Sequence, residues 1–270
     1  MPLLAGRRLV CTLVASALVL AVVLAPAAAG APSPWKQSVK IKLSSNRAAK
    51  PFGGVFVFQL VDTRCGRVAC PRSPDAERPK NAAKIEVQLP RGTRYSPKGS
   101  PLCPYWEATE KGPCGGEALL GTGSVSYNFN PFISPDFEFK TGRLWVVHAQ
   151  GGVRDPERPQ EELLGYGLGF FMALAPELGP EGRYAFPARV TPRGLITITM
   201  PERVAVFGQP GSLTGLAFRI RKNAQLNGTP LLRTPRRCNP DNGWRIKTVV
   251  TYEDDSTKTL FTRHPCFRRR

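Results

Sequence analysis

The stretch that decides the fold of this chain reads WRIKTVVTY and runs from Trp244 to Tyr252. Successive side chains of a β-strand point to opposite sides, so every second residue from Trp244 onward shares one face. The acidic segment 253–256 reads as a turn, and residues 257–262 return along the first strand. The sequence therefore predicts a β-hairpin with one face in a core.

The same alternation of apolar and polar residues recurs upstream and predicts further strands with one buried face. It is found in residues 39–43, 85–89, 196–200 and 216–221. Two other runs, residues 55–61 and 144–147, are apolar without alternation and suit strands covered on both faces. Glycine and proline, 26 and 27 of the 270 residues, separate these segments as turns would.

These segments predict an all-β protein, an immunoglobulin-like or jelly-roll-like β-sandwich with long disulfide-tethered loops. Residues 30–270 suit one β-sandwich domain, and two closely packed β subdomains with a boundary near residues 117–120 stay open. Three segments are expected to be long loops, namely residues 64–81, 96–116 and 153–160.

The N-terminus has the three parts of a secretory signal peptide. Arg7 and Arg8 give a positive start, residues 9–24 are almost entirely apolar, and Ala27–Ala29 form a small-residue cleavage site. A membrane anchor is the alternative, but this run is shorter than the ~20 apolar residues that a spanning helix needs. We therefore expect residues 1–29 to be a signal peptide, no transmembrane segment after cleavage, and a secreted or cell-envelope-associated protein.

Cleavage would remove Cys11 and leave six cysteines, and an even number in an exported chain indicates disulfides. Their spacing groups them into three neighbouring pairs, which we predict to be bonded: Cys65–Cys70, Cys103–Cys114 and Cys238–Cys266. A metal site is the weaker reading, because there is no Cys-x-x-Cys and the chain has only two histidines, His148 and His264. No metal or cofactor is expected.

No catalytic motif stands out. The nearest approach to a nucleophile elbow, residues 121–125, has no predicted helix after it. His148 follows an apolar strand and suits a core or barrel-edge position, and His264 is expected in a loop. The carboxylates fall mostly in predicted loops and turns, whereas a glycosidase needs two on rigid elements. We expect a protein that is not an enzyme and predict no catalytic residues.

The charge balance points to anionic partners. Cleavage would remove two of the 38 basic residues and none of the 20 acidic ones, leaving a net charge of +16. Such a field attracts wall polymers, acidic polysaccharides and anionic lipid headgroups, although charge that only maintains solubility is an equal alternative.

The candidate polyanion-binding residues combine clustered basic side chains with an aromatic ring for stacking. They are Arg219, Arg221, Lys222, Arg233, Arg236, Arg237 and Trp244, with Arg268–Arg270 at the C-terminus. The alternative is that these are strand faces turned to solvent plus a tail.

The order of several short motifs resembles a group of exported, β-rich, disulfide-bonded proteins common in actinobacteria-type genomes. The motifs are LPRG at residues 89–92, Cys103 and Cys114, LGTG at residues 120–123, and then Cys238, Trp244 and Cys266. The resemblance implies a β-sandwich and carries over no active site. The Cys65–Cys70 pair and the proline-rich loops depart from the group's pattern.

We therefore expect a secreted or cell-envelope-associated, non-catalytic β-sandwich protein that binds a partner or a polyanionic wall polymer and is a monomer. The alternatives are an extracellular enzyme acting on polysaccharide and a protein-recognition or inhibitory module. Nucleic acid is not an expected partner, because the chain is predicted to leave the cytoplasm.

Overall fold

In the part of the chain that the structure describes, the elements are β-strands, which confirms the all-β prediction. The computed structural model describes residues 35–63, 79–96, 103, 118–129, 139–149, 153–155, 158–163, 167–174, 182–201, 204–206, 209–221, 225–226 and 229–267. The expected signal peptide, residues 1–29, and the predicted Cys65–Cys70 bond lie outside these ranges and stay predictions.

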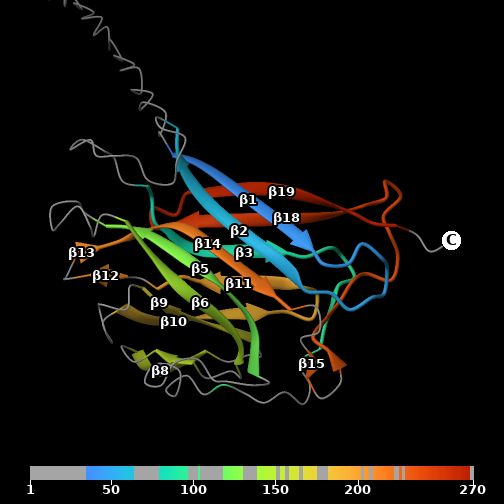
Figure 1. The fold of residues 1–270 in the computed structure, drawn as a ribbon, viewed down its shortest axis with the longest axis horizontal. Helices are drawn as coiled ribbons and strands as arrows, with labels where there is room; N and C mark the ends of the chain where they lie inside the picture. The colour runs from blue at the N-terminus through green and yellow to red at the C-terminus, as the bar shows by residue number, and fades with distance from the viewer. Residues whose placement is uncertain are drawn as a thin grey trace, which may run out of the picture. The chain divides into compact units, whose positions relative to one another are not determined.

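Eleven strands form one large antiparallel sheet (Figure 1). Its spatial order is β1 (Trp35–Leu43), β2 (Gly54–Asp62), β14 (Ser212–Ile220), β5 (Leu119–Asn128), β6 (Phe139–Ala149), β9 (Gly167–Ala173), β10 (Arg183–Val190), β11 (Leu195–Thr199), β3 (Ala82–Gln88), β18 (Gly243–Tyr252) and β19 (Thr257–Pro265). Strands from before and after residues 117–120 are therefore neighbours within the same sheet.

The remaining strands form four small pairs. They are β4 (Arg94–Tyr95) with β17 (Leu232–Arg233), β7 (Val153–Asp155) with β8 (Arg158–Leu163), β12 (Ala205–Val206) with β13 (Gln209–Pro210), and β15 (Gln225–Leu226) with β16 (Thr229–Pro230). The β7–β8 pair shows that the prediction of a loop at residues 153–160 is wrong. The segment is rich in charged residues and proline, a composition that is typical of loops, and it shows no alternation of apolar and polar residues that would indicate strands.

The C-terminal hairpin is confirmed. β18 pairs with β19 from Gly243 opposite Pro265 to Thr251 opposite Thr257, and the acidic segment 253–256 connects them. Trp244, Ile246 and Val250 are buried on the inner face of β18, as the alternation predicts. The sequence pattern works here because one side of the strand meets the core and the other meets solvent.

The other alternating segments also form strands with one buried face, in β1, β3, β11 and β14. The prediction for residues 55–61 is wrong in one respect. Phe56, Phe58 and Leu60 are buried, but Val55 and Val57 on the opposite face of β2 are only half-buried. In β6 both faces are covered as predicted, because Val146 lies in the main core and Val147 in a second apolar cluster.

The sheet curls until its first and last strands approach each other, so that it nearly closes into a barrel (Figure 1). Eleven antiparallel strands are an odd number, so the edge strands β1 and β19 run in the same direction. The Arg47–Phe267 bridge just beyond their ends is accordingly parallel, and the Phe267 N–H donates to the Asn46 carbonyl at 2.8 Å. Near the other end the Tyr252 hydroxyl donates to Gln37 Oε1.

The predicted immunoglobulin-like or jelly-roll sandwich is not confirmed, because one continuous sheet supplies the strands that surround the core. Alternation predicts that one face of each strand is buried. It does not reveal whether a second sheet covers that face or the same sheet curls over it. Only the order of the strands distinguishes the two arrangements.

Aromatic side chains fill the interior of the curled sheet. The Phe218 ring lies 5.0 Å from that of Phe56 and 5.1 Å from that of Phe170, measured between centroids. Phe170 in turn stacks on Phe186 at 5.3 Å. These contacts join β2, β14, β9 and β10 across the core, and such ring pairs stabilise beyond the area they bury.

Glycines on the inner face of β5 and β6 permit the tight curl. A Cβ atom added to Gly123 would lie 2.0 Å from the Ala217 carbonyl oxygen, and one added to Gly142 would lie 2.4 Å from that of Ala173. Neither position has room for a side chain because the neighbouring backbone occupies the space. Glycine at such inward positions is a means of bending a sheet toward closure.

We expect Gly123→Ala to lower the free energy of unfolding by about 1–3 kcal/mol, because the added methyl group must displace the β14 backbone. Ser124→Ala, at the next and outward-facing position of β5, is the control and should change it by less than about 0.5 kcal/mol. Urea denaturation measures both variants. Equal stability of the two would show that β5 and β14 do not approach as closely as described.

His264 lies in β19 and not in the expected loop, and its ring stacks on Trp244 with the centroids 6.2 Å apart. Burial lowers the pKa of His264 below its ordinary value of 6.5, a hydrogen bond with the Ser45 backbone opposes this, and Lys42 lowers it further. The folded state therefore takes up its proton at lower pH than the unfolded state does. The neutral His264 ring therefore costs the folded state nothing above pH 6.5, and the free energy of unfolding falls as the pH drops through and below 6.5.

The variant His264→Gln should therefore lose less stability than the wild-type protein between pH 7 and pH 5, since glutamine does not titrate. Denaturation midpoints across this range measure the difference. Parallel pH profiles for the two proteins would contradict a lowered His264 pKa.

Candidate functional site

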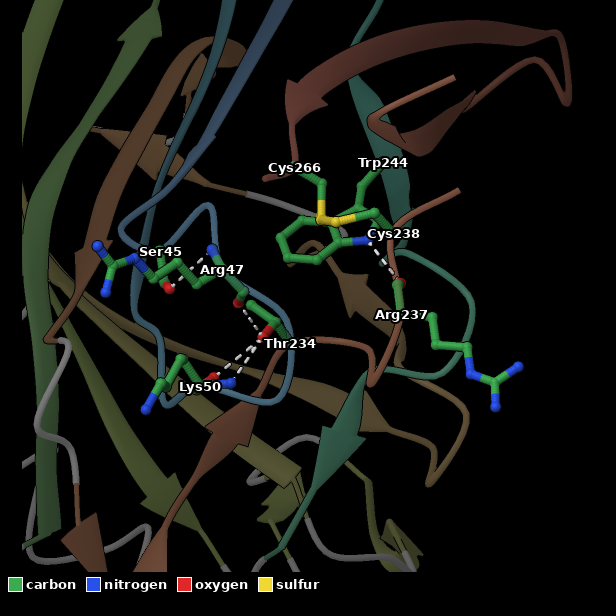
Figure 2. Close-up of a disulfide and its surroundings, with 8 residues drawn as sticks. All are labelled: Ser45, Arg47, Lys50, Thr234, Arg237, Cys238, Trp244 and Cys266. Carbon is green, nitrogen blue, oxygen red and sulfur yellow. Dashed lines mark hydrogen bonds between the residues drawn. A yellow bond between two sulfur atoms is a disulfide. The ribbon is translucent and has the colours of Figure 1, made fainter. Parts of the chain in front are cut away.

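Two chain segments far apart in sequence meet at the end of the sheet where β1 finishes and β18 begins. The buried Thr234 joins them: its hydroxyl accepts from the Lys50 N–H at 2.9 Å and donates to the Arg47 carbonyl at 2.7 Å. The Thr234 N–H donates to the Lys50 carbonyl at 2.9 Å. Figure 2 shows Thr234 between these residues. The 44–53 connection is thereby fixed against residues 231–242.

A disulfide fixes the same region from the other side. Cys238 and Cys266 are bonded with their Cα atoms 5.6 Å apart, which confirms that predicted pair. Trp244 lies beside the disulfide, and its indole N–H donates to the Arg237 carbonyl at 3.3 Å (Figure 2). The Cys266 N–H donates to the Asn242 carbonyl at 2.9 Å. Covalent and hydrogen bonds therefore hold the backbone that carries Arg237 and Cys238.

An open hollow of about 720 Å³ lies over this junction, and we name it the cationic groove. The described residues that line it are Arg47, Ala48, Ala49, Lys50, Arg236, Arg237, Cys238 and Phe267. Half of these residues are basic, all four basic side chains are exposed, and no acidic residue is among the described lining residues. A concave surface lined by one sign of charge concentrates the field that attracts oppositely charged ligands.

The positive charges are spread along the groove and do not converge on one point. Figure 2 shows the Arg47 and Lys50 side chains extending to one side of Thr234 and the Arg237 side chain extending to the other. Within the described part of the chain, ion pairs join Lys80 to Asp254, Lys84 to Glu86 and Arg263 to Asp241, and none of them involves a groove residue. The arrangement suits a chain of repeated anionic groups better than one small anion.

Two further arginines, opposite each other in a strand pair, extend the positive surface beyond the groove. Arg233 in β17 lies directly opposite Arg94 in β4, and both residues are exposed. Pro51, next to Lys50, forms a bridge with Arg233. Like charges directly opposite each other destabilise a strand pair. Positions that break a local rule in this way are expected at functional sites.

The structure brings together part of the predicted polyanion-binding set. Arg236 and Arg237 line the groove, and Arg233 is its neighbour. Arg219 and Arg221 are exposed at the end of β14, where Arg219 pairs with Val55 of β2, and neither lines the groove. Lys222 and Arg268–Arg270 lie outside the described residues.

Trp244 has another role than the one expected from the sequence. Its side chain is only 1% exposed, so the ring supports the Arg237 backbone from beneath and does not face a ligand.

Sequence reasoning missed Arg47, Lys50 and Phe267. The only signal was the short run RAAK at residues 47–50. It ends 186 residues before Arg236 in the chain of 270, and no pattern along the sequence links the two.

The other chemical groups considered in the sequence lie away from the groove or are engaged elsewhere. Both histidines are buried, and Ser124 lies within β5 rather than on a sharp turn. Hydrogen bonds from Lys80 and Ser256 lower the pKa of Asp254 to about 2, so this turn carboxylate already has cationic and hydroxyl partners. The described residues contain no group of three or more metal-ligating side chains.

Cys103 is disulfide-bonded, but Cys114 lies outside the described residues, so the Cys103–Cys114 pairing stays a prediction.

The sequence matches no protein-family model, no curated protein and no solved structure. In the ranges that the structure describes, no helix is long and apolar enough to cross a membrane.

The double variant Cys238→Ser/Cys266→Ser should lower the free energy of unfolding. The bonded cysteines are 28 residues apart, and closing a loop of that size stabilises by about 3–4 kcal/mol on the chain-entropy estimate. Guanidinium denaturation of the oxidised proteins measures the loss. A variant as stable as the wild type would show that the hydrogen bonds of Thr234 and Trp244 suffice to hold this end of the sheet.

Proposed function

We propose that this protein is a secreted or cell-envelope-associated, non-catalytic binding protein that holds an anionic polymer in the cationic groove. One observation carries the proposal: Arg47, Lys50, Arg236 and Arg237 line one hollow, and none of the other described residues that line it is acidic. The two segments that supply them come from opposite ends of the chain and are fixed together by Thr234.

Three features of the sequence support the compartment. The N-terminal segment has the pattern of a signal peptide, and the chain that follows it keeps six cysteines, an even number. Disulfides such as Cys238–Cys266 persist in oxidising surroundings outside the cytoplasm. The motif order that resembles exported proteins of actinobacteria-type genomes supports the same location. Anionic polymers of the cell envelope would be present there.

The expected binding is cumulative and salt-sensitive. An exposed ion pair contributes only about 0–1 kcal/mol, because water screens the charges and the long side chains lose freedom. Four basic residues along one groove add such contributions when the ligand presents several anions in a row. Salt weakens the attraction, since the screening length falls from ~10 Å at 0.1 M to ~3 Å at 1 M.

The rigid floor of the groove favours binding as well. The backbones of Arg47 and Lys50 are bonded to Thr234, and that of Arg237 accepts the Trp244 indole N–H. A ligand therefore needs to order side chains but not loops, and a preorganised site loses less free energy to ordering on binding.

The decisive comparison neutralises two charges inside the groove or two outside it. Arg236→Gln/Arg237→Gln removes groove charges, and Arg143→Gln/Arg189→Gln removes two exposed arginines from β6 and β10 and leaves the same net charge. We expect the groove variant to bind dextran sulfate about 5- to 30-fold more weakly at low salt, and the control less than about 2-fold more weakly. Titration calorimetry with the wild type and both variants measures this.

Equal losses in both variants would mean that net charge alone attracts the polymer and would contradict a defined site. Absence of wild-type binding to dextran sulfate and to purified cell wall at low salt would contradict the function itself. Binding that does not weaken toward ~1 M salt would contradict its electrostatic basis.

A further inference from the structure

Phe267 is an exposed aromatic residue held in place within the cationic groove. It follows Cys266, whose disulfide and backbone hydrogen bond fix the preceding residue. Its own N–H donates to the Asn46 carbonyl at 2.8 Å, and it forms a bridge with Arg47. Yet Phe267 remains 57% exposed. The ring therefore stands at a fixed backbone position with much of its surface open to solvent.

A single exposed apolar residue needs no explanation by itself, because folded proteins leave many apolar atoms on the surface. Phe261 is such a case: it lies on β19 opposite Lys247, is 70% exposed, and lines no part of the groove. Phe267 differs because the same hollow holds its ring and four basic side chains. A ligand that fills the hollow would meet both kinds of group.

We propose that the ligand of the groove is an acidic polysaccharide, with one sugar ring stacked on Phe267 and its anionic groups paired with the surrounding arginine and lysine side chains. This inference rests on the proposed function and names its ligand class. One face of a pyranose ring presents mainly C–H groups, whose slight positive charge complements the negative face of an aromatic ring. Carboxylates on neighbouring sugars suit the charge-assisted hydrogen bonds of arginine.

Polymers of other chemistry fit the groove less well. Linear polyphosphate offers charge but no ring, so it would leave Phe267 exposed to water. Single-stranded nucleic acid stacks successive bases on several aromatic side chains. Of the residues described around the groove, Phe267 alone offers an exposed aromatic ring, because the nearby Trp244 is buried. One ring among four distributed charges fits a polymer whose sugars themselves carry the anionic groups.

The test separates the contribution of the ring from that of the charges. Polygalacturonate and linear inorganic polyphosphate are titrated at the same salt concentration into the wild type, Phe267→Ala and Phe261→Ala. We expect Phe267→Ala to bind polygalacturonate about 3- to 10-fold more weakly and polyphosphate with unchanged affinity. Phe261→Ala, the matched loss of an exposed ring on the same hairpin, should change neither, and Phe267→Trp should retain polygalacturonate binding.

Arg236→Gln/Arg237→Gln should weaken the binding of both polymers, which keeps the two proposals distinguishable. If that variant loses affinity while Phe267→Ala changes both polymers equally or neither, the groove binds polyanions but does not recognise a sugar ring. Tighter, Phe267-dependent binding of a single-stranded DNA oligonucleotide would overturn the glycan assignment in favour of nucleic acid. Matching denaturation midpoints of the phenylalanine variants and the wild type show that the fold is intact.

Discussion

The near closure of an odd-numbered antiparallel sheet is the constraint on which the rest of this structure depends. Because eleven strands alternate in direction, β1 and β19 run the same way when the sheet curls round to bring them together. Two contacts join the ends of the sheet: Tyr252 at the end of β18 bonds to Gln37 of β1, and Phe267, just after β19, bonds to Asn46, just after β1. The second contact places the Phe267 ring beside Arg47, and so the closure of the fold also assembles the groove.

The groove illustrates how a stable scaffold can carry groups that repel one another. Arg47, Lys50, Arg236 and Arg237 share a hollow whose described lining has no acidic residue, and Arg94 opposes Arg233 nearby. Their side chains remain in solvent, which limits the mutual repulsion. The backbone beneath them is held by the Cys238–Cys266 bond and by the hydrogen bonds of Thr234 and Trp244. Rigid support and exposed charge together favour a ligand with several anionic groups.

Sequence patterns predicted the structure correctly where the prediction depended on residues within one strand or within two strands adjacent in sequence. The hairpin from Trp244 onward and the Cys238–Cys266 bond are confirmed for that reason. Patterns failed where burial depends on distant partners: Val55 and Val57 of β2 stay half-buried because no second layer covers them fully. For Trp244 two interpretations of the sequence competed: the alternation predicts a buried ring, and the basic cluster suggests a ring that stacks on a ligand. The structure confirms the first, with the ring buried beneath Arg237.

The sequence by itself determined that this protein is built of β-strands, which residues of the C-terminal hairpin face the core, and that the last two cysteines can bond across it. These properties follow from local rules, namely the two-residue period of a strand and the geometry of a hairpin. The tertiary structure alone decided that one sheet curls on itself, and that residues 47–50 meet residues 236–237 and Phe267 around one groove. Such long-range contacts depend on strand order and on the curl that Gly123 and Gly142 allow. No pattern within one segment of the sequence predicts the strand order or the curl.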